Sequence, residues 1–204
     1  MGTKYKLTVN NKSRNYGNIC VFQTMPDQPD NLLSLAWFSK AAHPETSIEF
    51  EWTTDYNFVW SNQGDLKPGV IFRASQVKYA DPSNISQNSI AFVKQYDAYH
   101  FAETDKTTKE GRLGIYTDQS VPHGEASVGI GMSGSGTFAV TATPNFSFIF
   151  QPHPRYWIAF GDYKVGTVMD IESMSNIKEV VFETDIYNKE ITLKEDNTWQ
   201  IERN

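Results

Sequence analysis

Short runs in which apolar and polar residues alternate recur along the whole chain. In one such run, Ile48, Phe50 and Trp52 share one face of an extended strand, while Glu49 and Glu51 point to the other. A helical face would instead repeat its apolar positions every three or four residues. The pattern therefore predicts half-buried strands that keep one face in water.

Runs of this kind, rich in β-branched and aromatic residues, are separated by turn residues throughout the sequence. The predicted strands are residues 5–9, 18–23, 47–53, 56–60, 70–79, 89–94, 99–102, 112–116, 126–132, 137–143, 146–150, 156–160, 166–171, 179–182, 190–193 and 198–201. Short strands at regular spacing favour a sandwich or a barrel. We therefore expect an all-β fold with little helix: a single-domain antiparallel β-sandwich over residues 1–204, with a barrel-like variant as the alternative. Residues 31–38 fit a helix and a buried strand equally well.

The stretch VGIGMSGSGTFAV, residues 128–140, holds four glycines and superficially resembles a nucleotide-binding loop. A glycine loop that binds phosphate needs a helix after it, because the anion sits on the free amides of the helix start. Here the chain alternates through Phe138 and Val140 to Pro144, which is a strand pattern, and no Lys-Ser or Lys-Thr follows the glycines. We expect a β-hairpin turning at residues 133–136, whose glycines supply positive φ angles, and no nucleotide cofactor.

Net charge and cysteine content limit which partners the protein can bind and in which cellular compartment it is expected. The formal net charge of −6 argues against nucleic acid and anionic membranes, which attract clustered Lys and Arg. No apolar run approaches the roughly 20 residues needed to cross a bilayer. The single cysteine, Cys20, cannot form an internal disulfide, and no apolar signal segment follows Met1. We expect a cytoplasmic protein with no membrane span and no nucleic-acid partner.

The residues that usually carry catalysis or bind metals show no familiar spacing. The four histidines are scattered and lack the paired spacing of zinc sites. They are His43, His100, His123 and His153. Glu49 and Glu51, or Asp170 and Glu172, alternate along predicted strands, and such a pair could flank a glycosidic bond. We predict no catalytic residue, no metal ligand and no cofactor, and we keep a carbohydrate-active protein as the alternative.

Aromatic residues, at 14%, are the most unusual part of the composition. In the segment 151–166, QPHPRYWIAFGDYKVG, two prolines hold His153 in an extended conformation. Arg155, Tyr156 and Trp157 follow directly. If exposed, rings here would offer a stacking surface for a sugar or a contact surface for another subunit. These four residues are our candidates for binding a ligand or partner.

A series of longer motifs stands in order along the chain: GNICVFQT, SLAWFSK, FEWTTDYNFVWS, LKPGVIFRASQV, ASVGIGMSGSGTFAV, PHPRYWIAFGDYKVGTVMDI and DNTWQI. From Tyr5 to about Ile201 the chain resembles the RhiA family of bacterial proteins. The resemblance implies quorum-regulated expression in bacteria that live near hosts. It implies no catalytic residues for this chain.

Two functions of different classes fit these observations. The first is a non-enzymatic protein that acts by binding a glycan or small molecule, or by self-assembly into a homo-oligomer, because strand edges and apolar patches are natural association surfaces. The second is a carbohydrate-binding or glycoside-hydrolysing protein that uses exposed aromatics and carboxylates. Membrane lysis is a third, which the acidic charge disfavours.

Overall fold

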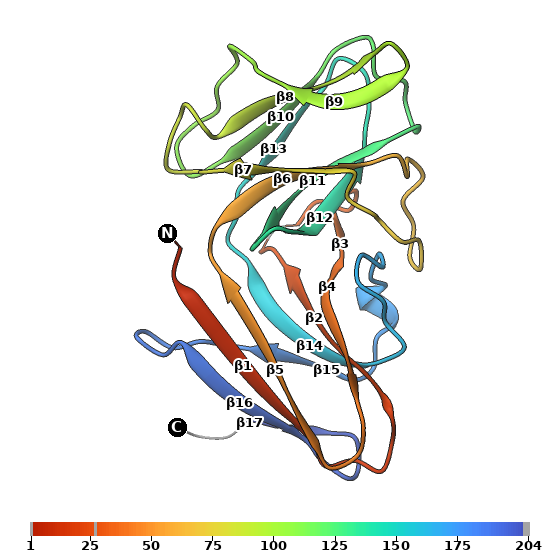
Figure 1. The fold of residues 1–204 in the computed structure, drawn as a ribbon, viewed down its shortest axis with the longest axis vertical. Coiled ribbons are helices and arrows are strands. Elements are labelled where there is room, and N and C mark those ends of the chain that lie inside the picture. The colour runs from red at the N-terminus through yellow and green to blue at the C-terminus, as the bar shows by residue number, and fades with distance from the viewer. Residues whose placement is uncertain (1, 27, 202–204) are drawn as a thin grey trace.

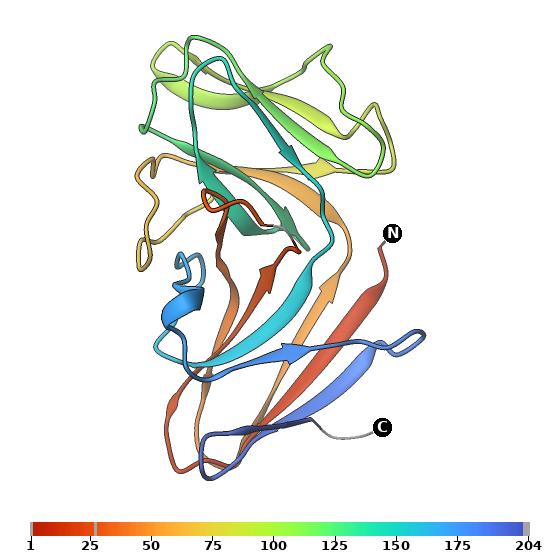
Figure 2. The same cartoon turned by 180° about the vertical axis from the view of Figure 1, so that it is seen from behind.

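The computed structural model describes residues 2–26 and 28–201, which form seventeen strands and one short 3₁₀ helix, η1 (Ile171–Ser173). The strands are β1 (Lys4–Asn11), β2 (Gly17–Thr24), β3 (Leu33–Ser34), β4 (Ala36–Ala42), β5 (Thr46–Thr53), β6 (Tyr56–Ser61), β7 (Gln76–Ala80), β8 (Ser89–Gln95), β9 (Ala98–Ala102), β10 (Leu113–Thr117), β11 (Ser127–Met132), β12 (Ser135–Thr141), β13 (Ser147–Phe150), β14 (Arg155–Gly161), β15 (Ile177–Val180), β16 (Asn188–Leu193) and β17 (Trp199–Ile201). They form four sheets, stacked as two facing pairs along the long axis of the molecule (Figures 1 and 2). The predicted all-β class with little helix is confirmed.

The two sheets at the bottom of Figure 1, called the lower sandwich here, have the strand orders β17-β16-β1-β5 and β15-β14-β2-β4. Alternate residues of the facing strands fill the space between them. Leu7 and Phe50 from the first sheet pack in one core with Val21 and Ile158 from the second. Period-two burial of apolar residues therefore drives this pairing of sheets.

The outer face of the first sheet carries the charges that the alternation predicts. Nζ of Lys4 lies 2.9 Å from the Glu51 carboxylate, and Nζ of Lys6 lies 2.5 Å from that of Glu49. All four side chains are at least one-third exposed. These ion pairs keep the face solvated and contribute little to stability.

The two sheets at the top of Figure 1, called the upper sandwich here, have the strand orders β13-β10-β8-β9 and β3-β12-β11-β6-β7. Phe92 and Ile115 from the first sheet pack with Phe58 and Val128 from the second in a separate core. None of the four sheets closes on itself among the described residues, so the barrel-like alternative is not adopted.

The glycine-rich stretch is the predicted hairpin, formed by β11 and β12. Its turn is tighter than expected, since Ser133 and Gly134 carry the positive φ angles of 53° and 78°. Gly131 serves another purpose: a Cβ there would lie 1.8 Å from the Ser135 carbonyl oxygen. Gly131 therefore permits close backbone approach. The expectation that the glycines of residues 133–136 supply positive φ angles holds for Gly134 and is wrong for Gly136, which lies within β12 and has no positive φ.

Some predicted elements differ from the structure. Residues 31–38 are not helical, and contribute β3 and the start of β4. Residues 70–75 and 166–171 lie outside the named strands, although Ile71 and Thr167 form an isolated bridge. Positive φ angles of 87° at Gly69 and 83° at Gly166 bend both segments away from a regular ladder.

Two pairings are parallel, β1 with β16 and β8 with β10. Both join strands that are not consecutive in the chain, so turn chemistry carries no signal for them. The remaining ladders are antiparallel, as predicted.

Candidate functional site

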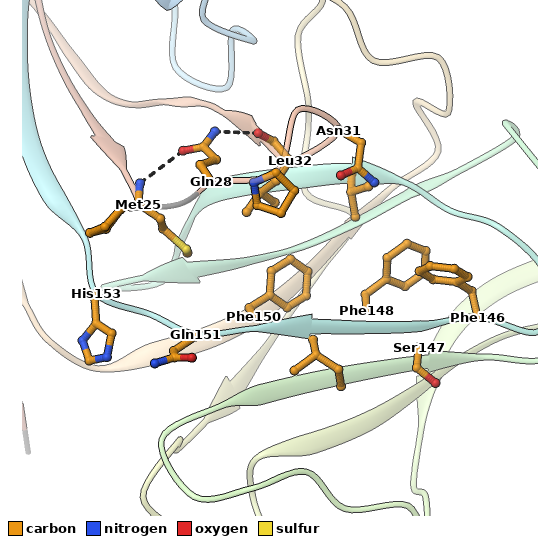
Figure 3. A pocket seen from close by; sticks show the side chains of 14 residues that line it. Met25, Gln28, Asn31, Leu32, Phe146, Ser147, Phe148, Phe150, Gln151 and His153 are labelled. Carbon is orange, nitrogen blue, oxygen red and sulfur yellow. Dashed lines mark hydrogen bonds between the residues drawn. The ribbon is translucent and has the colours of Figure 1, made fainter.

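A pocket of about 510 Å³ opens on one side of the upper sandwich, between strand β13 and the described part of the segment 25–32, which is residues 25, 26 and 28–32 (Figure 3). Both strands that flank this side, β13 and β3, are edge strands of their sheets. The described lining residues are Met25, Pro26, Gln28, Pro29, Asn31, Leu32, Val140, Phe146, Ser147, Phe148, Ile149, Phe150, Gln151 and His153. Its volume is in the range of small-molecule sites.

Three phenylalanines of one strand face form the floor of the pocket. Phe148 and Phe150 are buried in the upper core, whereas Phe146 stands at the rim with 48% of its surface exposed. The rings of Phe146 and Phe148 are 4.8 Å apart. Spacing by two residues brings all three rings to the same side of the strand, where Figure 3 shows them pointing toward the segment 25–32.

The opposite wall is held in place by the side chain of Gln28. Its Oε1 accepts a hydrogen bond from the amide of Met25 at 3.1 Å, and its Nε2 donates to the carbonyl of Leu32 at 2.5 Å (Figure 3). The amide of Leu32 also donates to the carbonyl of Pro29 at 2.9 Å. These bonds fix the wall before any ligand arrives, which lowers the entropy cost of binding.

The free edge of β13 lines this pocket with backbone groups that have no hydrogen-bond partner among the described residues. Strand β10 lies between β13 and β8. On its β13 side, the amide of Thr117 donates to the carbonyl of Phe146 at 2.9 Å. On its β8 side, the amide of Gly114 donates to the carbonyl of Asn88 at 2.8 Å. Backbone groups alternate in direction along a strand, so Phe148 bonds to β10 while Ser147 and Ile149 point away from it. Ser147 and Ile149 therefore present their amides and carbonyls outside the sheet.

On the opposite side of the same sandwich, a glutamine side chain bridges the two edge strands. Oε1 of Gln76, on β7, accepts hydrogen bonds from Nε1 of Trp60 at 2.9 Å and from the amide of Phe101, on β9, at 3.0 Å. One side chain thus bridges the two edge strands and occupies an edge amide of β9. No such side-chain bridge is found at the β13 edge among the described residues.

The described residues that line the pocket carry no charged side chain. No described lining residue is Asp, Glu, Lys or Arg, and the sequence 143–154, which contains β13, holds none of these four types. Polar groups at the pocket come from amides, a hydroxyl and the imidazole of His153. These described lining residues therefore offer no countercharge to a charged ligand.

The sequence profile of the RhiA family matches residues 2–204. The chain belongs to the RhiA family. Protein RhiA of Rhizobium leguminosarum bv. viciae is 38% identical to it over 203 residues, which cover 98% of this chain and 87% of that protein. No solved structure matches the chain. The resemblance expected from the order of motifs is thereby confirmed.

In this RhiA-family protein, the four predicted binding residues do not form one site. His153 lines the end of the pocket and is exposed. Arg155 is also exposed, with its Nε 3.9 Å from the Glu179 carboxylate. Tyr156 and Trp157 are consecutive on β14 and so point to opposite faces of its sheet. Only His153 of the four reaches the pocket.

The rings of Tyr156 and Trp157, both on β14, pack mostly against other residues of the protein. Tyr156 lies among the aromatic residues of the lower core, 5.2 Å from the Trp52 ring, and burial raises the pKa of its hydroxyl. Nε1 of Trp157 donates to Oγ1 of Thr24 at 2.8 Å, while its ring stacks on Phe22. A binding role for these residues stays a prediction.

Sequence reasoning predicted the strand 146–150 that forms the floor of the pocket, but did not single it out as part of a site, although a signal was present. The run NFSFIFQ, residues 145–151, combines alternating phenylalanines with a complete lack of charge and has prolines at 144 and 152. Uncharged edge strands of this kind are unusual, because exposed edges are normally protected by charge. Read in that way, the run points to an edge with a partner.

Other chemically reactive groups of the RhiA-family chain lie elsewhere. Cys20 is fully buried, and burial raises its pKa to about 12. Within residues 2–26 and 28–201, no group of three or more His, Cys, Asp and Glu is placed to hold a metal ion. No helix found in these residues is long and apolar enough to cross a bilayer.

Proposed function

We propose that this RhiA-family protein acts by binding a neutral, largely apolar ligand in the pocket beside β13, and that it catalyses no reaction there. The observation that carries the proposal is the lining itself: three phenylalanine rings facing a preformed wall, with no charged side chain among the described lining residues. Apolar surface moved from water into such a site gains about 25 cal/mol per Å².

The uncharged lining gives less support to a charged ligand or to catalysis by carboxylates. A charged group that enters an uncharged pocket loses its water without gaining a partner. Glycoside hydrolysis needs two carboxyl groups on either side of the bond, and the described lining includes none. A neutral glycan stacked on Phe146 is the form of the carbohydrate alternative that this geometry supports.

We place this activity in the cytoplasm as part of the same proposal. The support is that the only cysteine, Cys20, is buried as a free thiol. Disulfides are common in exported proteins of small size and rare in the cytoplasm.

A fluorescence titration with N-phenyl-1-naphthylamine, a neutral apolar dye, tests the proposal. We expect saturable binding that Phe146→Asp weakens by about tenfold or more, because the charge at the rim disfavours an apolar occupant. Tyr79→Asp is the matched control, since Tyr79 is exposed on the far edge strand β7. Equal binding by both variants, or none by the unmodified protein, would contradict the proposal. A neutral oligosaccharide that displaces the dye would identify the glycan form.

A further inference from the structure

Resting on the proposed function, we infer that the ligand of this pocket is an extended, uncharged polypeptide segment that pairs with the free edge of β13 as an added antiparallel strand. The backbone supplies the first reason. Ser147 and Ile149 each point an amide and a carbonyl away from β10, and both residues line the pocket. An extended chain can satisfy all four groups at once, whereas a compact apolar molecule satisfies none.

Lack of protection is the second reason. The amide of Phe101 at the free edge of β9 donates to Gln76, and the edge strands β7 and β15 carry Lys78 and Lys178. Strand β13 has no charge, and Ile149 on its outer face is 44% exposed. Natural sheets usually protect such an edge, so an unprotected one indicates a pairing surface.

Side-chain positions define the segment that fits. Residues of an added antiparallel strand share a face with the β13 residues opposite them. Those opposite Ser147 and Ile149 therefore lie on the outer face, and those opposite Phe148 point at the phenylalanine rings. The expected ligand alternates apolar residues, which face the rings, with neutral polar residues, which face water.

The surroundings favour a single extended segment over a second copy of this chain. Residues 25, 26 and 28–32 lie across the pocket from β13 (Figure 3), so an occupant of the β13 edge also lies beside this wall. A single extended segment is the narrowest polypeptide that can occupy this space. Pro144 and Pro152 lack amide donors and border the strand, so the pairing is short.

The test uses a fluorescein-labelled, uncharged heptapeptide that alternates Thr and Val, titrated by fluorescence anisotropy. In the proposed pairing, Thr amides face β13 and Val amides face water. N-methylation of the Thr amides is therefore expected to weaken binding by about tenfold or more, while N-methylation of the Val amides leaves binding nearly unchanged. Equal affinities for the two methylated peptides would overturn the inference.

Protein variants provide a second readout. Ile149→Lys places a charge on the exposed outer face of β13 and is expected to weaken peptide binding by about tenfold. Val77→Lys is the matched control, because Val77 is 45% exposed on the edge strand β7. Equal effects of the two substitutions would count against the edge of β13 as the binding site.

The two proposals fail in different ways. If the naphthylamine dye binds and the peptide does not, the pocket is an apolar site and strand addition is wrong. If neither binds, both proposals fall. Light scattering that shows a dimer dissociated by Ile149→Lys, together with no peptide binding, would identify a second copy as the occupant and overturn the inference.

Discussion

Nε1 of Trp37 donates a hydrogen bond to the carbonyl oxygen of Met132 at 3.0 Å. Trp37 belongs to the lower sandwich, and Met132 is the last residue of β11 in the upper one. The Met132 side chain continues the contact, because the Tyr156 hydroxyl lies 3.8 Å from its sulfur. The tip of the glycine-rich hairpin thus docks into the lower core, and we expect the two sandwiches to unfold together in one transition.

Trp37→Phe tests this docking contact. The substitution keeps an aromatic ring but leaves the buried Met132 carbonyl without its donor, so we expect a loss of about 1–3 kcal/mol in the free energy of unfolding. Urea denaturation followed by tryptophan fluorescence measures it. Tyr79→Phe, at an exposed position, should change the value by less than about 0.5 kcal/mol. Indistinguishable midpoints for the two variants would rule out a structural role for the bond.

Comparing Gly131→Ala with Gly134→Ala distinguishes two reasons for glycine in this hairpin: close backbone approach at Gly131 and a positive φ angle at Gly134. A Cβ at Gly131 would collide with the Ser135 carbonyl at 1.8 Å, so we expect a loss above about 3 kcal/mol or failure to fold. Gly134 has a φ of 78° and open space around it, so alanine there should cost only about 1–2 kcal/mol. Thermal unfolding by circular dichroism compares them. A larger loss of stability for Gly134→Ala than for Gly131→Ala would show that the turn conformation, and not close backbone approach, matters more for the stability of this hairpin.

Alkaline pH is expected to destabilise the protein through Tyr56. Burial, with a smaller contribution from Tyr5, raises the Tyr56 pKa to about 12, against about 10 in an unfolded chain. The folded state therefore favours the neutral phenol, and this stabilisation is complete below pH 10 and is lost as the pH rises toward 12. Urea midpoints measured across this window should fall less steeply for Tyr56→Phe. Tyr96→Phe, at the exposed β8–β9 turn, should leave the slope unchanged.

Cys20 should be unreactive in the folded protein. Its pKa of about 12 keeps the thiol protonated at pH 8, and the side chain is fully buried. A chromogenic disulfide reagent is expected to titrate one thiol per chain rapidly in urea and almost none without it. Rapid reaction of the native protein would mean that the lower sandwich opens readily around β2.

Local patterns predicted the strands well where burial alternates. The run around Ile48, Phe50 and Trp52 became β5, with the glutamates outside as expected. The strand predicted for residues 166–171 did not form, because Gly166 has a φ of 83°, which a pattern of apolar residues does not reveal. Residues 31–38 were ambiguous because Leu35 and Trp37 are buried in different cores, so no single periodic face exists.

The pocket was harder to predict than the strands. His153 was singled out for its flanking prolines, and it does line the pocket. The phenylalanines of β13 read as ordinary core, since Phe148 and Phe150 are indeed buried. What turns their strand into a site is its position at the edge of a sheet beside the segment 25–32, and strand order is a long-range property that short motifs do not encode.

The parallel pairing of β1 with β16 has a consequence for synthesis. It joins Leu7, at the beginning of the chain, to Lys189, near its end. The strands of the upper sandwich all precede residue 151, so the ribosome completes them well before β16, the parallel neighbour of β1, is synthesised. During that interval β1 has an unpaired edge, and nascent chains stalled before residue 188 should be the ones most dependent on chaperones.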